Sequence, residues 1–218
     1  MARRAEHRDA PADRERGLAD APDTDALAAA LTAGGLAVLD GFVPPPLVRG
    51  LIDCAHRRRD RGEFQAARIG AQRQLRLRER IRGDRTCWLE EPVFAEERSL
   101  LHELEQVRLR VNRAAFLGLF DIEVHYAWYP PGAGYARHLD QLHDGQQRVV
   151  TVILYLNEDW EPGSGGELRI FEARGHRDIE PVAGRLVCFL CDGLEHAVLP
   201  TPRDRLSITG WFRRRVSA

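Results

Sequence analysis

The stretch YPPGAGYARHLD, at residues 129–140, decides how the second half of the chain is expected to fold. Its Pro130-Pro131-Gly132 run predicts a turn, and strand-like residues lie on both sides of that turn. Similar turns, such as PGSGG at 162–166, separate further short segments with the composition of strands. The strands are expected at 121–129, 134–140, 148–156, 167–171, 185–191 and 206–213.

The first half of the chain has helical patterns instead. A short helix is expected from about Asp25, then a strand at 36–39, then a helix opened by Pro44-Pro45-Pro46, because proline suits the first helical turn. Arg57–Arg59 are expected at the solvated end of that second helix. A long amphipathic helix is expected over 96–119. The predicted apolar face of the second helix consists of Leu47, Leu51 and Cys54. That of the third helix consists of Leu100, Leu101, Leu104, Val107, Val111 and Phe116.

Helices followed by many short strands predict an α+β fold that is mainly β, with a double-sheet core supported by N-terminal helices. Residues 1–22 are charged and have little apolar surface to bury, so this tail is expected to be disordered. A single domain is expected over 23–218, with helical support at 23–120 and the β core at 121–213.

The composition argues against several classes of partner. The chain has 32 basic and 33 acidic residues, so its net charge of −1 gives no overall field that would attract nucleic acid or an anionic membrane. It contains no run of about 18 apolar residues, and its first residues lack the apolar region of a signal peptide. Its four cysteines are not spaced like a disulfide framework, and Cys188 and Cys191 are expected in the core. A cytoplasmic protein is therefore expected.

His138-Leu139-Asp140 is the first candidate for chemistry. Side chains at positions i and i+2 of a strand point to the same face, so both can reach one metal ion. His196, from a distant strand, would complete a set of two histidines and one carboxylate. On Fe(II) such a set leaves positions open for a chelating co-substrate and oxygen. The alternative is that the two histidines are hydrogen-bonded structural residues.

Arg205 is the candidate for holding that co-substrate. Its guanidinium can bind the far carboxylate of a five-carbon 2-oxo acid through two parallel hydrogen bonds. Ser207 lies on the same strand face, and Tyr155 and Tyr129 can supply hydroxyl groups from neighbouring strands. The alternative for Arg205 is a surface salt bridge.

Two aromatic residues and one histidine are further candidates for the lining of the pocket. Trp211 follows Arg205 by six positions, so an alternating strand puts both on the inner face. Trp88 belongs either to the pocket or to ordinary core packing. His125 alternates with Tyr129 on one strand, so it either faces the pocket or has a structural role.

The region before Trp88 is expected to begin with a mobile loop at 61–74. Leu75, Leu77 and Ile81 then alternate with arginines, which predicts a strand with one buried face. Seven arginines and two acids lie between Arg68 and Arg85. They form either a solvated strand face or a rim that contacts an acidic partner.

Several segments together resemble one family. They look like the 2-oxoglutarate- and Fe(II)-dependent prolyl hydroxylases, above all the subgroup of hypoxia-inducible-factor prolyl hydroxylases and their bacterial relatives. The resemblance covers roughly residues 35–213, but 129–135 is one residue shorter than in the animal enzymes and the loop at 141–147 differs. The segments are IRGDRTCWLE (81–90), YPPGAGYARHLD (129–140), RVVTVILYLNEDW (148–160), SGGELRIF (164–171), DIEPVAGRLVCF (178–189) and HAVLPTPRDRLSITGWF (196–212).

This resemblance implies a double-stranded β-helix, or jelly-roll, core and a role for each candidate residue. His138, Asp140 and His196 would be the iron ligands. The co-substrate pocket would hold Arg205 and Tyr155 at the 5-carboxylate of 2-oxoglutarate and Tyr129 near its 1-carboxylate, with Ser207, Trp211 and Ile153 beside them. The substrate would meet Arg148 at the pocket mouth, Asp84 and Trp88 at the base of a mobile loop at about 61–80, and Arg82.

The activity implied is hydroxylation of a prolyl residue in a protein, with succinate and carbon dioxide as the other products and ascorbate as the reductant. By analogy with bacterial relatives, translation elongation factor Tu is a candidate substrate. One alternative is a related oxygenase that acts on a free amino acid, a peptide natural product or alkylated nucleic acid. Another is a non-enzymatic metal-binding sensor on the same fold.

Overall fold

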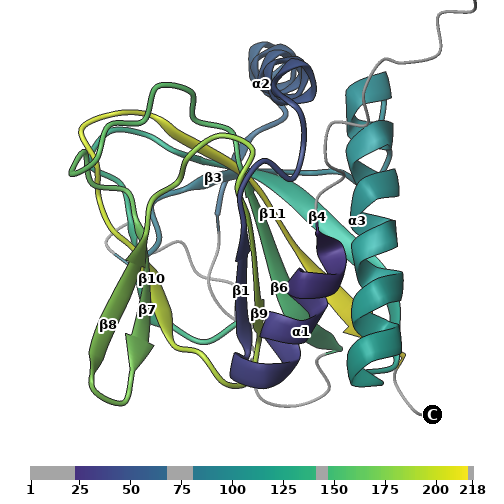
Figure 1. Cartoon of the computed structure of the whole chain (residues 1–218). Coiled ribbons are helices and arrows are strands. Elements are labelled where there is room, and N and C mark those ends of the chain that lie inside the picture. The colour runs from purple at the N-terminus through teal and green to yellow at the C-terminus, as the bar shows by residue number, and fades with distance from the viewer. Residues whose placement is uncertain (1–22, 68–80, 141–146, 216–218) are drawn as a thin grey trace, which may run out of the picture.

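The computed structural model describes residues 23–67, 81–140 and 147–215. Within these residues it contains three helices, α1 (Thr24–Gly34), α2 (Pro45–Asp60) and α3 (Ala95–Ala115), and eleven strands in two sheets (Figure 1). None of the described helices is long and apolar enough to span a bilayer. The tail expected to be disordered, 1–22, lies outside the described residues.

The two sheets are antiparallel. The larger has the order β1-β9-β6-β11-β4-β3-β2, and the smaller has the order β5-β10-β7-β8. The larger sheet consists of β1 (Leu36–Leu39), β2 (Gln65–Ala66), β3 (Arg85–Trp88), β4 (Leu119–Tyr129), β6 (Arg148–Tyr155), β9 (Leu186–Leu190) and β11 (Arg205–Arg214). The smaller sheet consists of β5 (Tyr135–His138), β7 (Leu168–Glu172), β8 (Gly175–Ile179) and β10 (His196–Val198). The predicted fold class, mainly β with N-terminal helices, is confirmed.

The larger sheet has one face toward the helices and one toward the smaller sheet. Figure 1 shows α1 and α3 side by side against the larger sheet, with β7, β8 and β10 on the far side of the molecule. Successive side chains of a strand point to opposite faces. On β4, Val124 and Tyr126 pack into the main core with Leu104 of α3, so His125 and Tyr129 point the other way.

The same alternation on β11 selects the residues that face the site. Ile208 and Phe212 belong to the main core. Their neighbours face the space between the two sheets, and these are Arg205, Ser207, Thr209 and Trp211.

The third helix ends four residues earlier than expected, at Ala115. Phe116 adopts a left-handed conformation with φ 52°, and its side chain is 89% exposed instead of lying in the apolar stripe. The side-chain oxygen of Asn112 accepts a hydrogen bond from the Leu119 N–H at 2.9 Å, and this turns the chain toward β4. An early left-handed cap therefore replaces the last predicted turn.

Arg58 was expected at a solvated helix end, and this prediction is wrong. It lies four residues after Cys54 and seven after Leu51, so it shares their buried face of α2. Its guanidinium donates two hydrogen bonds to the carboxylate of Glu97, at 2.7 and 2.9 Å, and one to Glu63 at 2.6 Å. These carboxylates make the burial of its charge possible.

The region before β3 is only partly described. The loop expected at 61–74 contains the short strand β2, which pairs with β3. Residues 68–80, with most of the strand expected around Leu75 and Leu77, lie outside the described residues. Arg82, just after them, forms an isolated β-bridge with Tyr135.

Candidate metal centre and co-substrate pocket

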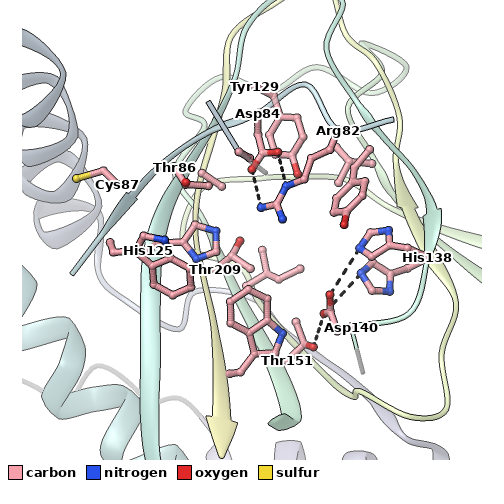
Figure 2. Close-up of a pocket in the computed structure, with 18 of the residues that line it drawn as sticks. Arg82, Asp84, Thr86, Cys87, His125, Tyr129, His138, Asp140, Thr151 and Thr209 are labelled. Carbon is pink, nitrogen blue, oxygen red and sulfur yellow. Dashed lines mark hydrogen bonds and ion pairs between the residues drawn. The ribbon is translucent and has the colours of Figure 1, made fainter. Parts of the chain in front are cut away.

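Two side chains from neighbouring strands and a third just beyond the end of one strand converge on one point. His138 ends β5 and pairs in register with His196, which begins β10, so their ring centroids lie 4.2 Å apart. Asp140 follows two residues after His138. Its carboxylate oxygens lie 3.5 Å from Nε2 of His138 and 3.7 Å from Nε2 of His196 (Figure 2). One donor atom from each residue lies within 4.8 Å of the others, a spacing that can accommodate a single metal ion.

Backbone contacts orient both imidazoles for ligation. Nδ1 of His138 lies 2.8 Å from the carbonyl oxygen of Ala136, and Nδ1 of His196 lies 3.1 Å from that of Leu194. A neutral imidazole that donates from Nδ1 keeps the lone pair of Nε2 for a metal. The hydrogen-bonded histidines of the alternative interpretation are therefore present, but their hydrogen bonds leave Nε2 free.

The protonation states of these groups also suit a metal. Burial disfavours the charged form of Asp140, but its contacts with His138, His196 and Thr151 outweigh burial and hold the pKa of the carboxyl well below its usual range. The Thr151 hydroxyl donates to Oδ2 of Asp140 at 2.6 Å. Burial lowers the pKa of His196, so its ring stays neutral. An anionic oxygen and neutral nitrogens are the donors that Fe(II) takes in sites of two histidines and one carboxylate.

The three residues open onto a cavity of about 890 Å³ between the two sheets. Most of the predicted site residues line it, and Ser207 and Tyr155 do not. Those that line it are Arg82, Asp84, Trp88, Tyr129, His138, Asp140, Arg148, Ile153, His196, Arg205 and Trp211.

Arg205 is a buried charge without a counterion in the described part of the chain. Its side chain is 1% exposed, and its one described hydrogen bond runs from Nε to the carbonyl oxygen of Gly166 at 2.8 Å. The rings of Tyr129 and Tyr155 each lie 5.1 Å from its guanidinium carbon. The alternative of a surface salt bridge is therefore wrong. A buried guanidinium in this state is suited to an anionic ligand.

Tyr155 and Ser207 lie behind the cavity wall. Both are buried, and the Tyr155 hydroxyl has no hydrogen-bond partner among the described residues. The Ser207 hydroxyl lies 3.4 Å from that of Thr209. The Tyr155 ring lies beside the guanidinium of Arg205, with its centroid 5.1 Å from the guanidinium carbon.

One wall of the cavity is aromatic. The ring of His125 contacts two indoles, with its centroid 4.6 Å from that of Trp88 and 5.4 Å from that of Trp211, and the two indoles lie 6.2 Å from each other. Trp88 is 42% exposed and lines the cavity, so it is not core packing. The Arg148 guanidinium lies 3.6 Å from the Trp211 ring and donates to Glu123 at 2.6 Å. The wall is therefore aromatic, with one cation at its edge.

Tyr135 forms the opposite wall and was not singled out from the sequence. Its ring stacks on that of His138 at 3.5 Å. Arg82 lies over the other side of Tyr135, 4.9 Å from its ring, and forms two hydrogen bonds to Asp84 at 2.7 and 3.0 Å (Figure 2). The only feature of the sequence that could have indicated Tyr135 was its position three residues before His138 in a predicted strand.

The cysteines take no part in a cluster of metal ligands. All four are free and buried, as expected for Cys188 and Cys191 in the core. Burial raises the pKa of Cys191 to about 12, and its sulfur lies 3.3 Å from the Thr151 hydroxyl.

The chain matches known proteins over its whole described core. The family model described as "2OG-Fe(II) oxygenase superfamily" matches residues 124–213, the segment that contains all three candidate ligands and Arg205. The crystal structure of a prolyl-4-hydroxylase from Pseudomonas putida is 44% identical, with a TM-score of 0.80, and the match covers 88% of this chain and 99% of that one. This chain belongs to the 2OG-Fe(II) oxygenase superfamily and, within it, to the family of the prolyl hydroxylases.

Two further relatives agree with that family. Egl nine homolog 1 from Homo sapiens is 34% identical over 189 residues, which are 82% of this chain and 43% of the human protein. The chain thus spans less than half the length of this relative. A prolyl hydroxylase from Trichoplax adhaerens, solved with a peptide of hypoxia-inducible factor, shares the fold at 24% identity and a TM-score of 0.78, over 87% of this chain and 88% of that one. The predicted jelly-roll core is therefore confirmed.

The superfamily name states its cofactors, Fe(II) and 2-oxoglutarate. The donors of His138, Asp140 and His196 fit the metal, and the buried cation of Arg205 fits a dicarboxylate.

Proposed function

We propose that this chain is a dioxygenase that hydroxylates a prolyl residue of a protein, using Fe(II) and 2-oxoglutarate. One observation carries the proposal. The buried, carboxylate-free guanidinium of Arg205 opens onto the same cavity as the cluster of His138, Asp140 and His196. That pairing suits a co-substrate with one end on the metal and the other on Arg205.

His138, Asp140 and His196 hold the iron in this proposal. When bound, iron and 2-oxoglutarate together activate oxygen. One atom of O₂ becomes the hydroxyl group of the product, and the other enters succinate as carbon dioxide leaves. Thr151 holds the Asp140 carboxylate in place through its hydrogen bond, and the two histidines contribute more than Thr151 to keeping that carboxyl ionised.

Arg205 binds the 5-carboxylate of 2-oxoglutarate, with the Tyr155 hydroxyl as a second donor. The Tyr155 hydroxyl lacks a partner in the described residues, which supports this role. Tyr129 lies near the 1-carboxylate end, and Ser207 supports the wall behind Arg205. Ile153 and Trp211 keep water away from the reacting atoms.

The target residue enters past Arg148, Trp88 and the Arg82–Asp84 pair. Trp88 is half-exposed at the cavity edge, and an indole beside a charged rim suits an extended peptide. The human relative is an Egl nine homolog, and the Trichoplax relative was solved with a peptide of hypoxia-inducible factor. A protein substrate is the simplest match to both, and translation elongation factor Tu is our candidate.

The cellular setting follows from the same reasoning. We infer a cytoplasmic enzyme, because four buried cysteines are all free. Ascorbate would serve as the reductant that restores iron oxidised without substrate turnover. We infer one domain over 23–218, although β1, β2 and β3 of the larger sheet lie before residue 121, in the part expected to be helical support only.

Mass spectrometry of a bacterial lysate incubated with the purified chain, Fe(II) and 2-oxoglutarate tests the function. We expect a +16 Da change on a prolyl residue, with one succinate formed for each hydroxylation. The Asp140→Ala variant, which lacks the carboxylate ligand, is the matched control and should give neither product. A change confined to non-prolyl residues would contradict the prolyl assignment, and iron-dependent succinate formation without any modified protein would contradict the protein substrate.

A further inference from the structure

His125 is a polar residue in the aromatic wall of the cavity. It lies on β4, in register with Trp88 of β3 on one side and Thr209 of β11 on the other. It lines the cavity, is 1% exposed, and is drawn beside Thr209 in Figure 2. Its Nδ1 atom is buried and has no hydrogen-bond partner among the described residues.

The imidazole of His125 is neutral. Burial lowers its pKa to about 3, and the nearby positive charges of Arg82 and Arg148 act in the same direction. A neutral imidazole has one N–H donor and one acceptor nitrogen. Buried polar groups are nearly always hydrogen-bonded, so an unpartnered one at a binding cavity indicates a group that a ligand satisfies.

The described residues around His125 offer its Nδ1 atom no hydrogen-bond partner. The two rings that contact the imidazole are the indoles of Trp88 and Trp211, at centroid distances of 4.6 and 5.4 Å. The Trp211 ring is stacked on the imidazole and the Trp88 ring is tilted against it, and an aromatic ring is a poor partner for a nitrogen that needs a full hydrogen bond. A partner for Nδ1 therefore comes with the contents of the cavity.

The position along the strands indicates which ligand that is. Arg205 pairs with Tyr129, and His125 lies four residues further along β4, opposite Thr209. Four residues of a strand span roughly 13 Å. An extended five-carbon dicarboxylate spans roughly 7 Å between its outer oxygens. A 2-oxoglutarate anchored on Arg205 does not reach His125, which instead lies at the end with the half-exposed Trp88 and with Arg148.

We propose that Nδ1 of His125 donates a hydrogen bond to a backbone carbonyl of the segment that carries the target proline, which makes His125 a specificity-determining residue. This inference rests on the proposed function. A proline has no backbone N–H, so the peptide bond that precedes it offers an acceptor carbonyl and no donor. The neutral imidazole of His125, which lies beside two indoles, is placed to donate a hydrogen bond to such a carbonyl while the indoles contact the proline ring.

Three substitutions separate this role from mere packing. In His125→Asn the side-chain amide places a polar group near the position of Nδ1, whereas in His125→Gln the amide extends toward the position of Nε2. His125→Leu fills the space without any hydrogen bond. His102→Leu, at an exposed position of α3, is the matched control for loss of a histidine.

The assay uses the full chain with Fe(II) and 2-oxoglutarate, and a library of extended peptides that each contain one central proline. On a peptide that the wild type hydroxylates, we expect His125→Leu and His125→Gln to raise the KM for the peptide about five- to tenfold. His125→Asn should stay within about twofold of the wild type. The KM for 2-oxoglutarate and the affinity for Fe(II) should not change in any variant.

Three results overturn the inference, and the last of them is distinguishable from the other two because it also overturns the proposed function. If the wild type hydroxylates a peptide but His125→Leu and His125→Asn have equal KM values for it, His125 does not bind the substrate. A change in the KM for 2-oxoglutarate alone leads to the same conclusion. If the wild type hydroxylates no prolyl peptide or protein, the proposed function fails and the inference fails with it.

Discussion

Arg58 and Arg205 are both buried arginines, with 5% and 1% of their surface exposed, yet they have opposite surroundings. Arg58 lies between α2 and α3 and contacts the carboxylates of Glu97 and Glu63. Arg205 lies between the sheets, and its one described hydrogen bond is to a backbone carbonyl. A buried arginine with its own carboxylates stabilises the fold, whereas we propose that Arg205, with none among the described residues, takes its carboxylate from a ligand.

The largest expected effect on stability comes from removing the charge of Arg58. Arg58→Met should lower the free energy of unfolding by about 3–5 kcal/mol, because the fully buried Glu97 would lose its counterion. Urea denaturation measures this. The double variant Arg58→Met with Glu97→Gln should recover part of the loss, and no recovery would show that packing dominates over charge.

The corresponding change at Arg205 should have little effect on the free protein. Arg205→Met removes a buried charge that has no carboxylate in the described residues, so we expect the free energy of unfolding of the ligand-free protein to stay the same or rise. Affinity for 2-oxoglutarate should fall by about 2–4 kcal/mol, because the 5-carboxylate would lose its charged partner. Calorimetry with Fe(II) under nitrogen measures the second effect. Unchanged affinity would show that Arg205 does not bind the co-substrate.

Thr151 provides a third case. In the candidate metal site the carboxylate of Asp140 accepts a hydrogen bond from a hydroxyl group instead of from an arginine. Thr151→Val keeps the shape of the side chain and removes its 2.6 Å hydrogen bond to Asp140. We expect Fe(II) affinity to fall about tenfold, which corresponds to about 1.4 kcal/mol. Competition with a chelator of known affinity measures the change, and equal affinity in both proteins would assign Thr151 to packing alone.

The smallest expected effect concerns pH. The pKa of His125 is about 3 in the fold and 6.5 in its absence, so the unfolded chain binds a proton that the folded chain does not. Stability from the neutral ring is complete above pH 6.5 and is lost as the pH falls toward 3. Between pH 6.5 and 5.5 the wild type should lose about 1 kcal/mol more unfolding free energy than His125→Asn. Identical pH dependence in urea titrations would contradict the low pKa.

The sequence was sufficient for elements with a clear apolar period. The strand expected at 36–39 and the six expected after residue 120 all exist, with ends shifted by no more than two residues. Valine, isoleucine and leucine mark most of them, whereas β5, with the sequence YARH, is marked only by the turn before it. β8 was missed because its sequence, GHRDI, is exposed at four of five positions and has no such pattern. β2 and β10 have only two and three residues, too few for a period to be recognised.

The site was predictable to a similar degree and for related reasons. The spacing of His138 and Asp140 on a strand, with Arg205 and Trp211 on one face of another, follows from local geometry. The stacking of Tyr135 on His138 and the hydrogen bond from Thr151 depend on how strands pack between sheets, which local spacing does not encode. Arg58 was misplaced because a run of three arginines obscured its position on the buried face of α2.

A crystal structure of the chain grown under nitrogen with Fe(II) and 2-oxoglutarate tests the central claim most directly. Anomalous scattering at the iron edge should place one ion between Nε2 of His138, Nε2 of His196 and the carboxylate of Asp140. The far carboxylate of 2-oxoglutarate should lie on the guanidinium of Arg205. An iron bound by other residues, or a co-substrate that leaves Arg205 without an anion, would contradict the account.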